Sequence, residues 1–333
     1  MILGGDIGGT HTRLALFADD GQRLADHPER EYPSREHAGL DAIALQFLRD
    51  TGVRPAAACF GVAGPVRNGR SVATNLPWII DAAELGRVLG MSTWVINDLE
   101  ALAWGLTALR PEELALLSPG ASGATGNAAV VAAGTGLGEA GLYWDGRQHR
   151  PFATEGGHAS FAPSDDVEVE LLHWLERRFA EHVSWERVVS GPGLVSLYEF
   201  LRDTGRGQEP PWLAEAIRTG DPGAAITAAA LDGRSPLAAA ALDRFVSLYG
   251  HESGNFALKT MATGGVYLGG GIAPRILPKL RDGTFLRGFL DKGRMRPLLE
   301  AMPVNVVLND QAGLLGAGRC AARAVADGRP PGV

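Results

Sequence analysis

The chain has 333 residues, a formal net charge of −7 and 45% hydrophobic residues. A single core tends to stop growing near ~250 to 300 residues, so we expect two domains, although one compact domain remains possible. Because the net charge is negative, the chain lacks the overall positive charge that would attract nucleic acid or an anionic membrane surface, and this favours a small-molecule partner. No apolar run approaches the ~20 residues that span a bilayer, and no signal-peptide pattern opens the chain, so we expect a cytoplasmic location.

The two cysteines, Cys59 and Cys320, stand alone in apolar surroundings, without a Cys or His at metal-ligand spacing. A structural zinc site is therefore not expected, and packing in a reducing compartment fits both residues. The chain has only three lysines against 28 arginines. A phosphate site would therefore depend on backbone amides rather than on a motif lysine.

The first part of the chain predicts three antiparallel strands, a helix and a return to strand. The opening "GGDIGG" leads into "THTRLALF", and a helical pattern follows over residues 36–50. A strand at 92–98, "STWVIND", then hands over to a helical pattern at 99–109. Asp98 is thus expected at the carboxyl end of a strand, where ligands collect in open α/β sheets.

Residues 127–148 repeat the opening pattern of an apolar strand, a glycine cluster, a second strand and a turn, which indicates a duplicated fold. Residues 165–260 are predicted to be mostly helical, with an alanine-rich helix from about 235. A last strand and a closing helix follow. We expect one domain to comprise residues 1–107 with the final helix at about 309–325, and the other to comprise residues 108–308.

Three glycine clusters lack the known phosphate-binding fingerprints. No G-x-x-x-x-G-K-[ST] occurs, and no G-x-G-x-x-G leads directly into a helix; each cluster is expected to turn into another strand. A lone glycine hairpin is more often a structural turn, but two facing hairpins can cradle phosphate with their amides. The first two clusters also supply hydroxyls and a carboxylate suited to magnesium: Gly5, Asp6, Gly8, Gly9 and Thr10, then Gly134, Thr135, Gly136 and Gly138. The third cluster, Gly269 to Gly271, could admit a flat base.

Eight segments in the same order along nearly the whole chain carry a family resemblance. They are "GGDIGGT", "TNLPWII", "VINDLEAL", "AGTGLG", "EGGHASFAP", "WERVVSGPGLV", "GGVYLGGGIAPR" and "NDQAGLLGAG". The chain resembles the bacterial glucokinases without a zinc motif, within the superfamily of hexokinase, actin and heat-shock ATPases. The resemblance implies a duplicated, ribonuclease H-like (actin-like ATPase) α/β fold with two domains flanking a cleft. It also implies transfer of the γ-phosphoryl group of ATP to the 6-hydroxyl of D-glucose.

Asp98 is the candidate general base, and Asn97 beside it is a candidate glucose ligand. As a residue just before a helix, Asp98 could instead be only an N-cap. Glu155 and His158, three apart around two glycines, are expected near one ligand. Asn75 is equally well explained as a turn residue.

Other roles rest on the resemblance alone. It implies that Glu186 binds glucose, that Asp6 organises Mg²⁺ through water, and that the protein forms a homodimer. The implied ATP contacts are Gly5, Asp6, Ile7, Gly8, Gly9, Thr10, Thr135, Gly136, Gly270 and Gly271. His11 departs from the family, which usually has Asn or a similar small polar residue there, so the local phosphate contacts and the nucleotide preference stay open.

Three alternatives remain. The first is a kinase for another hexose, or one that uses polyphosphate or ADP as donor. The second is a sugar-sensing regulator on the same fold, which is disfavoured because such regulators usually carry a DNA-binding segment before the first hairpin. The third is an actin-type ATPase, which has no reason to keep the set Asn97, Asp98, Glu155 and His158.

Overall fold

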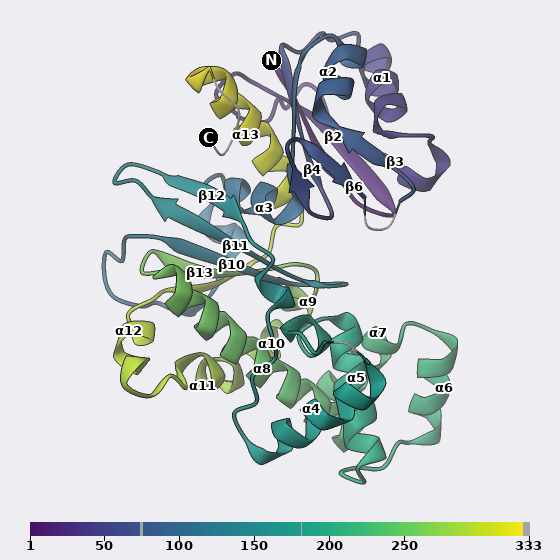
Figure 1. The fold of residues 1–333 in the computed structure, drawn as a ribbon, viewed down its shortest axis with the longest axis vertical. Coiled ribbons are helices and arrows are strands. Elements are labelled where there is room, and N and C mark those ends of the chain that lie inside the picture. The colour runs from purple at the N-terminus through teal and green to yellow at the C-terminus, as the bar shows by residue number, and fades with distance from the viewer. Residues whose placement is uncertain (74–75, 181, 329–333) are drawn as a thin grey trace. The chain divides into compact units, whose positions relative to one another are not determined.

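The computed structural model describes residues 1–73, 76–180 and 182–328. The chain forms two compact units, coloured along the sequence in Figure 1. Unit 1 comprises Met1–Glu113, Arg147–Ala153 and Asn309–Val333. Unit 2 comprises Leu114–Gly146 and Thr154–Leu308. Each unit is built around its own sheet.

The sheet of unit 1 has five strands in the order β3-β2-β1-β4-β8. Strands β1 and β2 form an antiparallel hairpin, β3 continues it, and β4 and β8 run parallel to β1. The bounds are β1 (Ile2–Ile7), β2 (His11–Phe17), β3 (Arg30–Pro33), β4 (Ala57–Val62) and β8 (Ser92–Asn97). The three antiparallel strands predicted at the start of the chain are confirmed.

Helices and short strands complete unit 1. The helices are α1 (Leu40–Thr51), α2 (Ala82–Leu89), α3 (Asp98–Leu106) and α13 (Ala312–Asp327). The short strands are β5 (Val66–Arg67), β6 (Arg70–Val72) and β7 (Ile79–Asp81), which form a small sheet, and β12 (His149–Ala153). The side chain of Asp81 accepts hydrogen bonds from the first amides of α2, which fixes where that helix begins.

Unit 2 repeats the same strand arrangement. Its strands run in the order β11-β10-β13-β14-β9, with β10 antiparallel to β11 and parallel to β13. The bounds are β9 (Leu114–Ser118), β10 (Ala128–Ala133), β11 (Leu137–Trp144), β13 (Gly265–Gly269) and β14 (Val304–Val307). The order β11-β10-β13-β14 matches β2-β1-β4-β8 of unit 1, so the duplication predicted from the repeat at 127–148 is confirmed.

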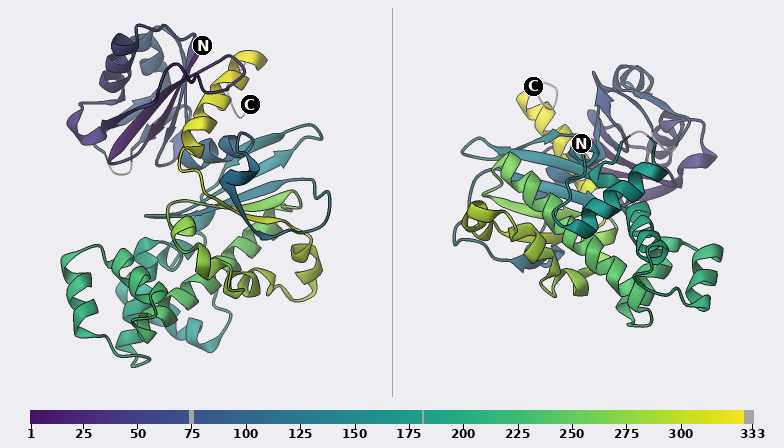
Figure 2. Two further views of the ribbon diagram at one scale, coloured as in Figure 1. Left: turned by 180° about the vertical axis from the view of Figure 1, so that it is seen from behind. Right: turned by 60° about the horizontal axis from the view of Figure 1, so that its bottom comes forward.

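The rest of unit 2 is mostly helical, and the helical region predicted over 165–260 is confirmed. The helices are α4 (Asp166–Arg178), α5 (Gly191–Asp203), α6 (Pro211–Thr219), α7 (Pro222–Leu231), α8 (Pro236–Thr260), α9 (Ile272–Arg275), α10 (Leu277–Leu280), α11 (Thr284–Leu290) and α12 (Arg296–Glu300). Helix α8 is the longest of these, and Figure 2 shows it running along the sheet of its unit. Its buried Phe245 and Tyr249 pack in one core with Phe285 of α11.

Helices α3 and α13 approach each other through glycines. A Cβ atom at Gly105 of α3 would overlap the backbone of Ala312, and one at Gly316 of α13 would overlap the carbonyl oxygen of Ala101. The same helix lies against β1, where the amide of Gly318 faces Gly4. The small-residue pattern "AGLLGAGRCAA" therefore lets α13 pack closely on both the helix and the sheet of unit 1.

Two local predictions were wrong. The helix predicted from residue 36 begins at Leu40, because Ser34–Glu36 form a separate 3₁₀ turn before it. The third glycine cluster was predicted to turn into another strand, but it enters helix α9 after Gly270. Gly270 has a φ of 78° and touches the backbone of Ala133, a conformation and a spacing that only glycine accepts without strain.

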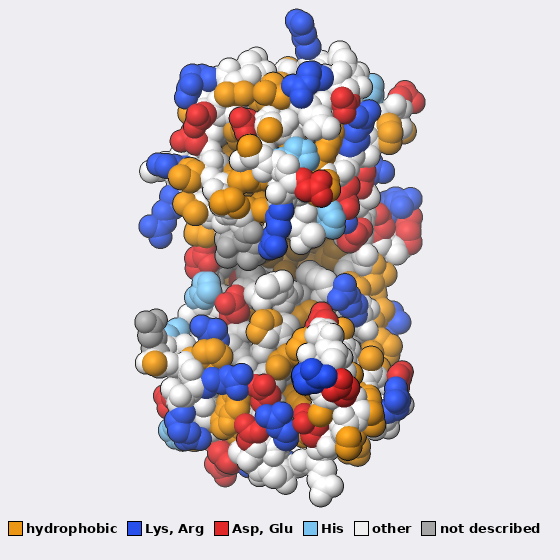
Figure 3. All heavy atoms as spheres, turned by 90° about the vertical axis from the view of Figure 1, so that its right-hand side faces the viewer, with side chains coloured by type: hydrophobic (Ala, Val, Ile, Leu, Met, Phe, Trp, Pro, Cys, Tyr) orange, Lys and Arg blue, Asp and Glu red, His pale blue; other side chains and the backbone are white. Residues whose placement is uncertain are grey.

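The surface carries charges of both signs. In Figure 3, Lys and Arg side chains are interspersed with Asp and Glu over the face drawn. Within the described residues, no helix combines the length and apolar character needed to cross a membrane.

We expect Gly316→Ala to destabilise the protein by about 1–3 kcal/mol, because the added methyl group must separate α13 from α3. Thermal unfolding measures this as a lower Tm. Gly223→Ala is the matched control, since a Cβ there meets its nearest atom at 3.5 Å and alanine favours the helix. Equal Tm values for Gly316→Ala and the wild type would contradict the close packing.

Candidate functional site

The first set of predicted site residues lies along one edge of the sheet in unit 1. Ile7, Val62 and Asn97 are register partners at the carboxyl ends of the parallel strands β1, β4 and β8. The loop Gly8–Thr10 and the residue Asp98 follow directly from the outer two of these strands. The predicted placement of Asp98 at a strand-to-helix junction is therefore confirmed.

Asn97, rather than Asp98, is the N-cap of α3. Its side-chain oxygen accepts hydrogen bonds from the amides of Leu99 at 2.9 Å and Glu100 at 3.4 Å, and its Nδ2 donates to Gly64 O at 3.0 Å. The purely structural explanation of Asp98 as the cap is therefore wrong. One Oδ of Asp98 accepts from the amide of Leu99 at 2.9 Å, which orients the carboxylate without using both of its oxygens in that contact.

The loop of the first hairpin is held by a buried serine. Ser34 Oγ donates to the carbonyl oxygen of Gly8 at 2.8 Å and lies 2.9 Å from Thr12 Oγ1. The amide of Ser34 donates to the carbonyl oxygen of Thr10 at 2.9 Å. Thr10 itself is exposed at the tip of the hairpin. These bonds fix the backbone of Gly8–Thr10 while its outer surface stays accessible.

Gly4, Gly5 and Ile7 serve the core. A Cβ at Gly5 would lie 2.5 Å from the Phe60 ring, and one at Gly4 would lie 2.5 Å from the Phe17 ring. Ile7 is buried among the apolar residues of its unit. The glycines at 4 and 5 are thus explained by packing, and Gly5 and Ile7 are both buried.

Asp6 lies among charged groups that the sequence analysis did not identify. Its register partner on β2 is Arg13, which ion-pairs with Glu31 at 2.9 Å and Asp310 at 3.3 Å. Burial raises the pKa of Asp6, Arg13 opposes that shift, and Asp310 adds to it. Gly313, in the first turn of α13, would place a Cβ 3.7 Å from the Asp6 carboxylate. His11 is half exposed and lies 3.6 Å from Glu31.

A second set of predicted residues comes together in unit 2, around the hairpin of β10 and β11. The amide of Leu137 donates to Glu186 Oε2 at 2.9 Å, and a Cβ at Gly136 would overlap the same carboxylate. The amide of Gly191 donates to Gly134 O at 2.8 Å. Thr135 is exposed at the hairpin tip, as Thr10 is in unit 1. Glu186 is therefore in contact with the second glycine loop, which its sequence context did not indicate.

Glu155 and His158 flank a short turn that packs against the same hairpin. Glu155 Oε2 and His158 Nε2 are 4.0 Å apart, and both side chains are more than 60% exposed. Gly157 between them contacts the backbone of Leu137 so closely that a Cβ would overlap its carbonyl oxygen. The turn that carries Glu155 and His158, the β10–β11 hairpin and Glu186 therefore lie together in unit 2.

Gly270 and Gly271 are exposed at the end of β13, beside β10. Asn75 lies outside the described residues.

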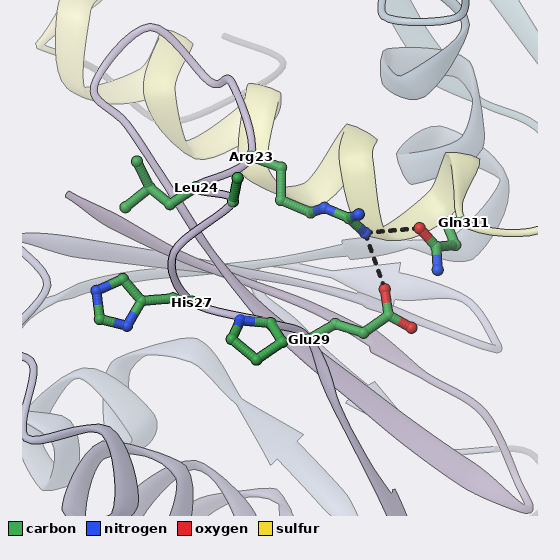
Figure 4. Close-up of a pocket in the computed structure, with 7 residues that line it drawn as sticks. Arg23, Leu24, His27, Glu29 and Gln311 are labelled. Carbon is green, nitrogen blue, oxygen red and sulfur yellow. Dashed lines mark hydrogen bonds and ion pairs between the residues drawn. The ribbon is translucent and has the colours of Figure 1, made fainter.

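A surface cavity of about 350 Å³ in unit 1 contains none of the predicted residues. Figure 4 shows Arg23 reaching across it to Glu29 and Gln311, with its Nη1 at 3.0 Å from Glu29 Oε2 and 2.6 Å from Gln311 Oε1. The charges that line this cavity are therefore already paired with each other. Among the described residues, no group of three or more His, Cys, Asp or Glu side chains could hold a metal ion.

Comparison with known proteins decides the family. The family model described as Glucokinase matches residues 3–324. The chain belongs to the glucokinase family. It is 42% identical to a glucokinase of Nostoc sp., over 97% of this chain and 99% of that protein, and 39% identical to a glucokinase of Synechocystis sp., over 96% and 98%. The prediction of an ATP-dependent glucose kinase is confirmed.

Solved structures confirm the fold. A glucokinase from an Antarctic psychrotroph is 30% identical and superposes with a TM-score of 0.81, covering 96% of this chain and 98% of that one. A ROK family glucokinase from Streptomyces griseus, solved in complex with glucose and AMPPNP, has a TM-score of 0.65 at 22% identity, covering 97% and 99%. The duplicated, actin-like α/β fold predicted from the sequence is therefore present.

Glu100 provides a stability test beside the candidate base. Burial raises its pKa from 4.5 to about 7, and the neighbouring Trp104 opposes the shift. The folded state then binds more protons than the unfolded state between these two values, so the free energy of unfolding falls as the pH rises across that window. We expect Glu100→Gln to remove this fall and to be more stable than the wild type by about 1–3 kcal/mol at pH 7.

Urea unfolding at pH 5, 6, 7 and 8 measures this gain, which should grow up to pH 7 and then level off. Glu112→Gln is the control, because Glu112 is 63% exposed and its replacement should leave the two pH curves parallel. A gain for Glu100→Gln that is the same at every pH would contradict the raised pKa.

Proposed function

We propose that Asp98 is the general base when this glucokinase transfers the γ-phosphoryl group of ATP to the 6-hydroxyl of D-glucose. The observation that carries this assignment is the position of Asp98. Its carboxylate follows the carboxyl end of β8, at the sheet edge that also carries Gly8–Thr10, and Asn97 already caps α3. A carboxylate held at a strand end, beside the residue that caps the helix, can accept a proton from an alcohol.

The phosphate contacts are proposed for the exposed parts of the two hairpins. In unit 1 these are Gly8, Gly9 and Thr10, and in unit 2 they are Thr135 and Gly136. Successive backbone amides in a tight turn bind anions, and the threonine hydroxyls add donors. Gly5 and Ile7 support this loop from inside the sheet. Gly270 and Gly271 present open backbone against which the adenine base can lie.

Mg²⁺ is the metal that the family uses with ATP, and Asp6 fits it as an outer ligand. The Asp6 carboxylate has Gly313 of the first α13 turn as a neighbour, and glycine adds no side chain at that point. Oxygen donors that bind Mg²⁺ through water are common in phosphoryl-transfer enzymes. When bound, the ion would neutralise charge on the phosphate oxygens. Arg13, paired to Glu31 and Asp310, holds a positive charge beside this carboxylate in the protein itself.

The glucose contacts are proposed for Asn97, Glu155, His158 and Glu186. Asn97 has a second amide hydrogen beyond the one given to Gly64. Glu155 and His158 are exposed and close enough to bind neighbouring hydroxyls. Glu186 keeps one oxygen beyond the one that accepts from Leu137. Hydrogen bonds of this kind give specificity because each unpaired hydroxyl would cost ~1–3 kcal/mol.

The reaction then needs few chemical steps from the protein. Asp98 takes the proton of the 6-hydroxyl as its oxygen attacks the γ-phosphorus in line with the departing ADP. The hairpin amides hold the phosphates, and the sugar ligands fix the attacking oxygen. The cytoplasmic location, the homodimer and the effect of His11 on donor choice stay predictions.

Asp98→Asn should lower kcat by ~10² or more while glucose affinity changes much less, because the amide keeps the shape but cannot accept the proton. A coupled assay for glucose 6-phosphate measures kcat, and calorimetric titration measures glucose binding. Asp50→Asn is the control, since Asp50 forms an exposed ion pair with Arg30. Near-normal turnover of Asp98→Asn would remove Asp98 from the mechanism.

A ligand panel tests the substrate assignment. Glucose should raise Tm more than mannose or fructose, because ligands stabilise the folded state in proportion to their affinity. ATP with Mg²⁺ should support faster glucose phosphorylation than ADP or polyphosphate. A larger stabilisation by another hexose, or faster turnover with another donor, would replace the corresponding part of the proposal.

A further inference from the structure

Two carboxyl side chains are buried together in unit 2, outside the groups used above. Glu139 on β11 is 1% exposed and Glu252 on α8 is 0% exposed. Among the described donors, none gives a hydrogen bond to either carboxyl oxygen of Glu139 or to Oε1 of Glu252. Each carboxyl group lies close enough to the other to shift its pKa. One of them can act as a donor to the other only if it carries a proton.

The surroundings assign the charge to Glu252. Its Oε2 accepts from Asn255 Nδ2 at 2.9 Å, and Lys259 Nζ lies 3.9 Å from its Oε1. Burial raises the pKa of Glu252, and Asn255, Lys259 and Lys292 oppose that shift by favouring its charged form. Among the described residues, Glu139 has no such donor. Lys259 favours its charged form as well, and the nearby Tyr249 gives its hydroxyl hydrogen to Val131. The proton is therefore best placed on Glu139, with Glu252 as the acceptor.

Glu139 lies directly under the turn that carries Glu155 and His158. A Cβ at Gly156 would overlap Glu139 Oε2, so the carboxyl group touches the backbone of the turn. Thr154 Oγ1 donates to the carbonyl oxygen of Glu139 at 2.9 Å, and the amide of Gly156 donates to Thr154 Oγ1 at 3.2 Å. Movement of the Glu139 side chain would therefore displace this turn.

We propose that Glu139 and Glu252 share one proton and that this protonated pair positions the turn Thr154–His158 for glucose binding. Glu139 is then a positioning residue that acts through Glu155 and His158, so the inference rests on the proposed glucose contacts. Loss of the proton would leave two buried carboxylates in contact beneath the turn, and their repulsion would push the turn away from its place.

The pH range follows from the environment of the pair. Burial, with the charge of Glu252 added, raises the pKa of Glu139 from 4.5 to about 9, while Lys259 opposes the shift. The pair therefore keeps its proton at neutral pH and loses it as the pH rises through about 9. Between pH 4.5 and about 9 the folded state holds a proton that the unfolded state releases, so stability falls as the pH rises.

The test compares the wild type with Glu139→Gln and Glu252→Gln from pH 6.5 to 10. The wild-type KM for glucose should rise roughly threefold or more above pH 9, with a smaller change in kcat. Glu139→Gln supplies a permanent N–H donor to Glu252 and should show a flat KM in this range. Glu252→Gln removes the second carboxylate, and with it the repulsion, so its KM should rise less than that of the wild type. Glu139→Ala lacks that donor and should have a raised KM at every pH.

A second readout uses no substrate and so does not depend on the proposed function. The Tm of the wild type should fall more steeply between pH 5 and 9 than the Tm of Glu139→Gln. Parallel Tm curves would overturn the shared proton. Stabilisation of the wild type by potassium that Glu139→Gln abolishes would also overturn it, because a bound cation would then neutralise the two carboxylates in place of the proton. A KM that rises above pH 9 equally in the wild type and both glutamine variants would overturn the positioning role. Absence of glucose phosphorylation would instead count against the proposed function.

Discussion

Helix α13 reaches β1 and α3 only because no side chain separates their backbones. Gly316 meets the carbonyl oxygen of Ala101, Gly105 meets Ala312, and the amide of Gly318 faces Gly4. Backbone contact of this kind leaves no room for adjustment, so the position of the helix is fixed by its neighbours. The start of the helix is fixed with it, and this is why Gly313 lies next to the Asp6 carboxylate although the two residues are at opposite ends of the chain.

Each unit holds a glycine loop at the edge of its sheet, and the two units do this with different residues. In each, an antiparallel hairpin opens a sheet that continues with parallel strands, so a glycine loop and the ends of the parallel strands share one edge. The braces differ. Ser34 holds the loop of unit 1 with its hydroxyl and its amide, whereas the carboxylate of Glu186 holds the loop of unit 2 at Leu137. The two units therefore share a backbone arrangement, whereas the side chains that support it differ between them.

Patterns confined to neighbouring residues were predicted well from the sequence. The hairpins, the helical region of unit 2 and the placement of Asp98 at a strand end all follow from local periodicity. Capping was misjudged, because Asn97 and Asp98 are both good N-cap residues and only the backbone position of the first helical residue separates them. Gly4 and Gly5 could not be interpreted locally either, since the rings of Phe17 and Phe60 that pack on them belong to other strands.

Polar contacts between residues far apart in the chain could not be predicted from the sequence. Glu139 stands in "LGEAGLYW", where an isolated acid in a strand looks solvent-facing, and its partner Glu252 is far along the chain in a helix. The ion pairs of Arg13 with Glu31 and Asp310 likewise join three separate parts of the chain. Such contacts depend on tertiary placement, and a single sequence carries no signal for them.

Ser34, which lies under the first hairpin, also keeps the loop Gly8–Thr10 ordered before any ligand binds. Ser34 is fully buried, and it holds Gly8–Thr10 in a single backbone arrangement through bonds to both ends of the loop. A glycine-rich loop without such a brace would lose conformational freedom each time it closed on a ligand, at about 1–2 kcal/mol for each ordered residue. Here that ordering is completed when the chain folds. An anion arriving at these amides meets a preorganised surface, so less of its interaction free energy is consumed in arranging the backbone.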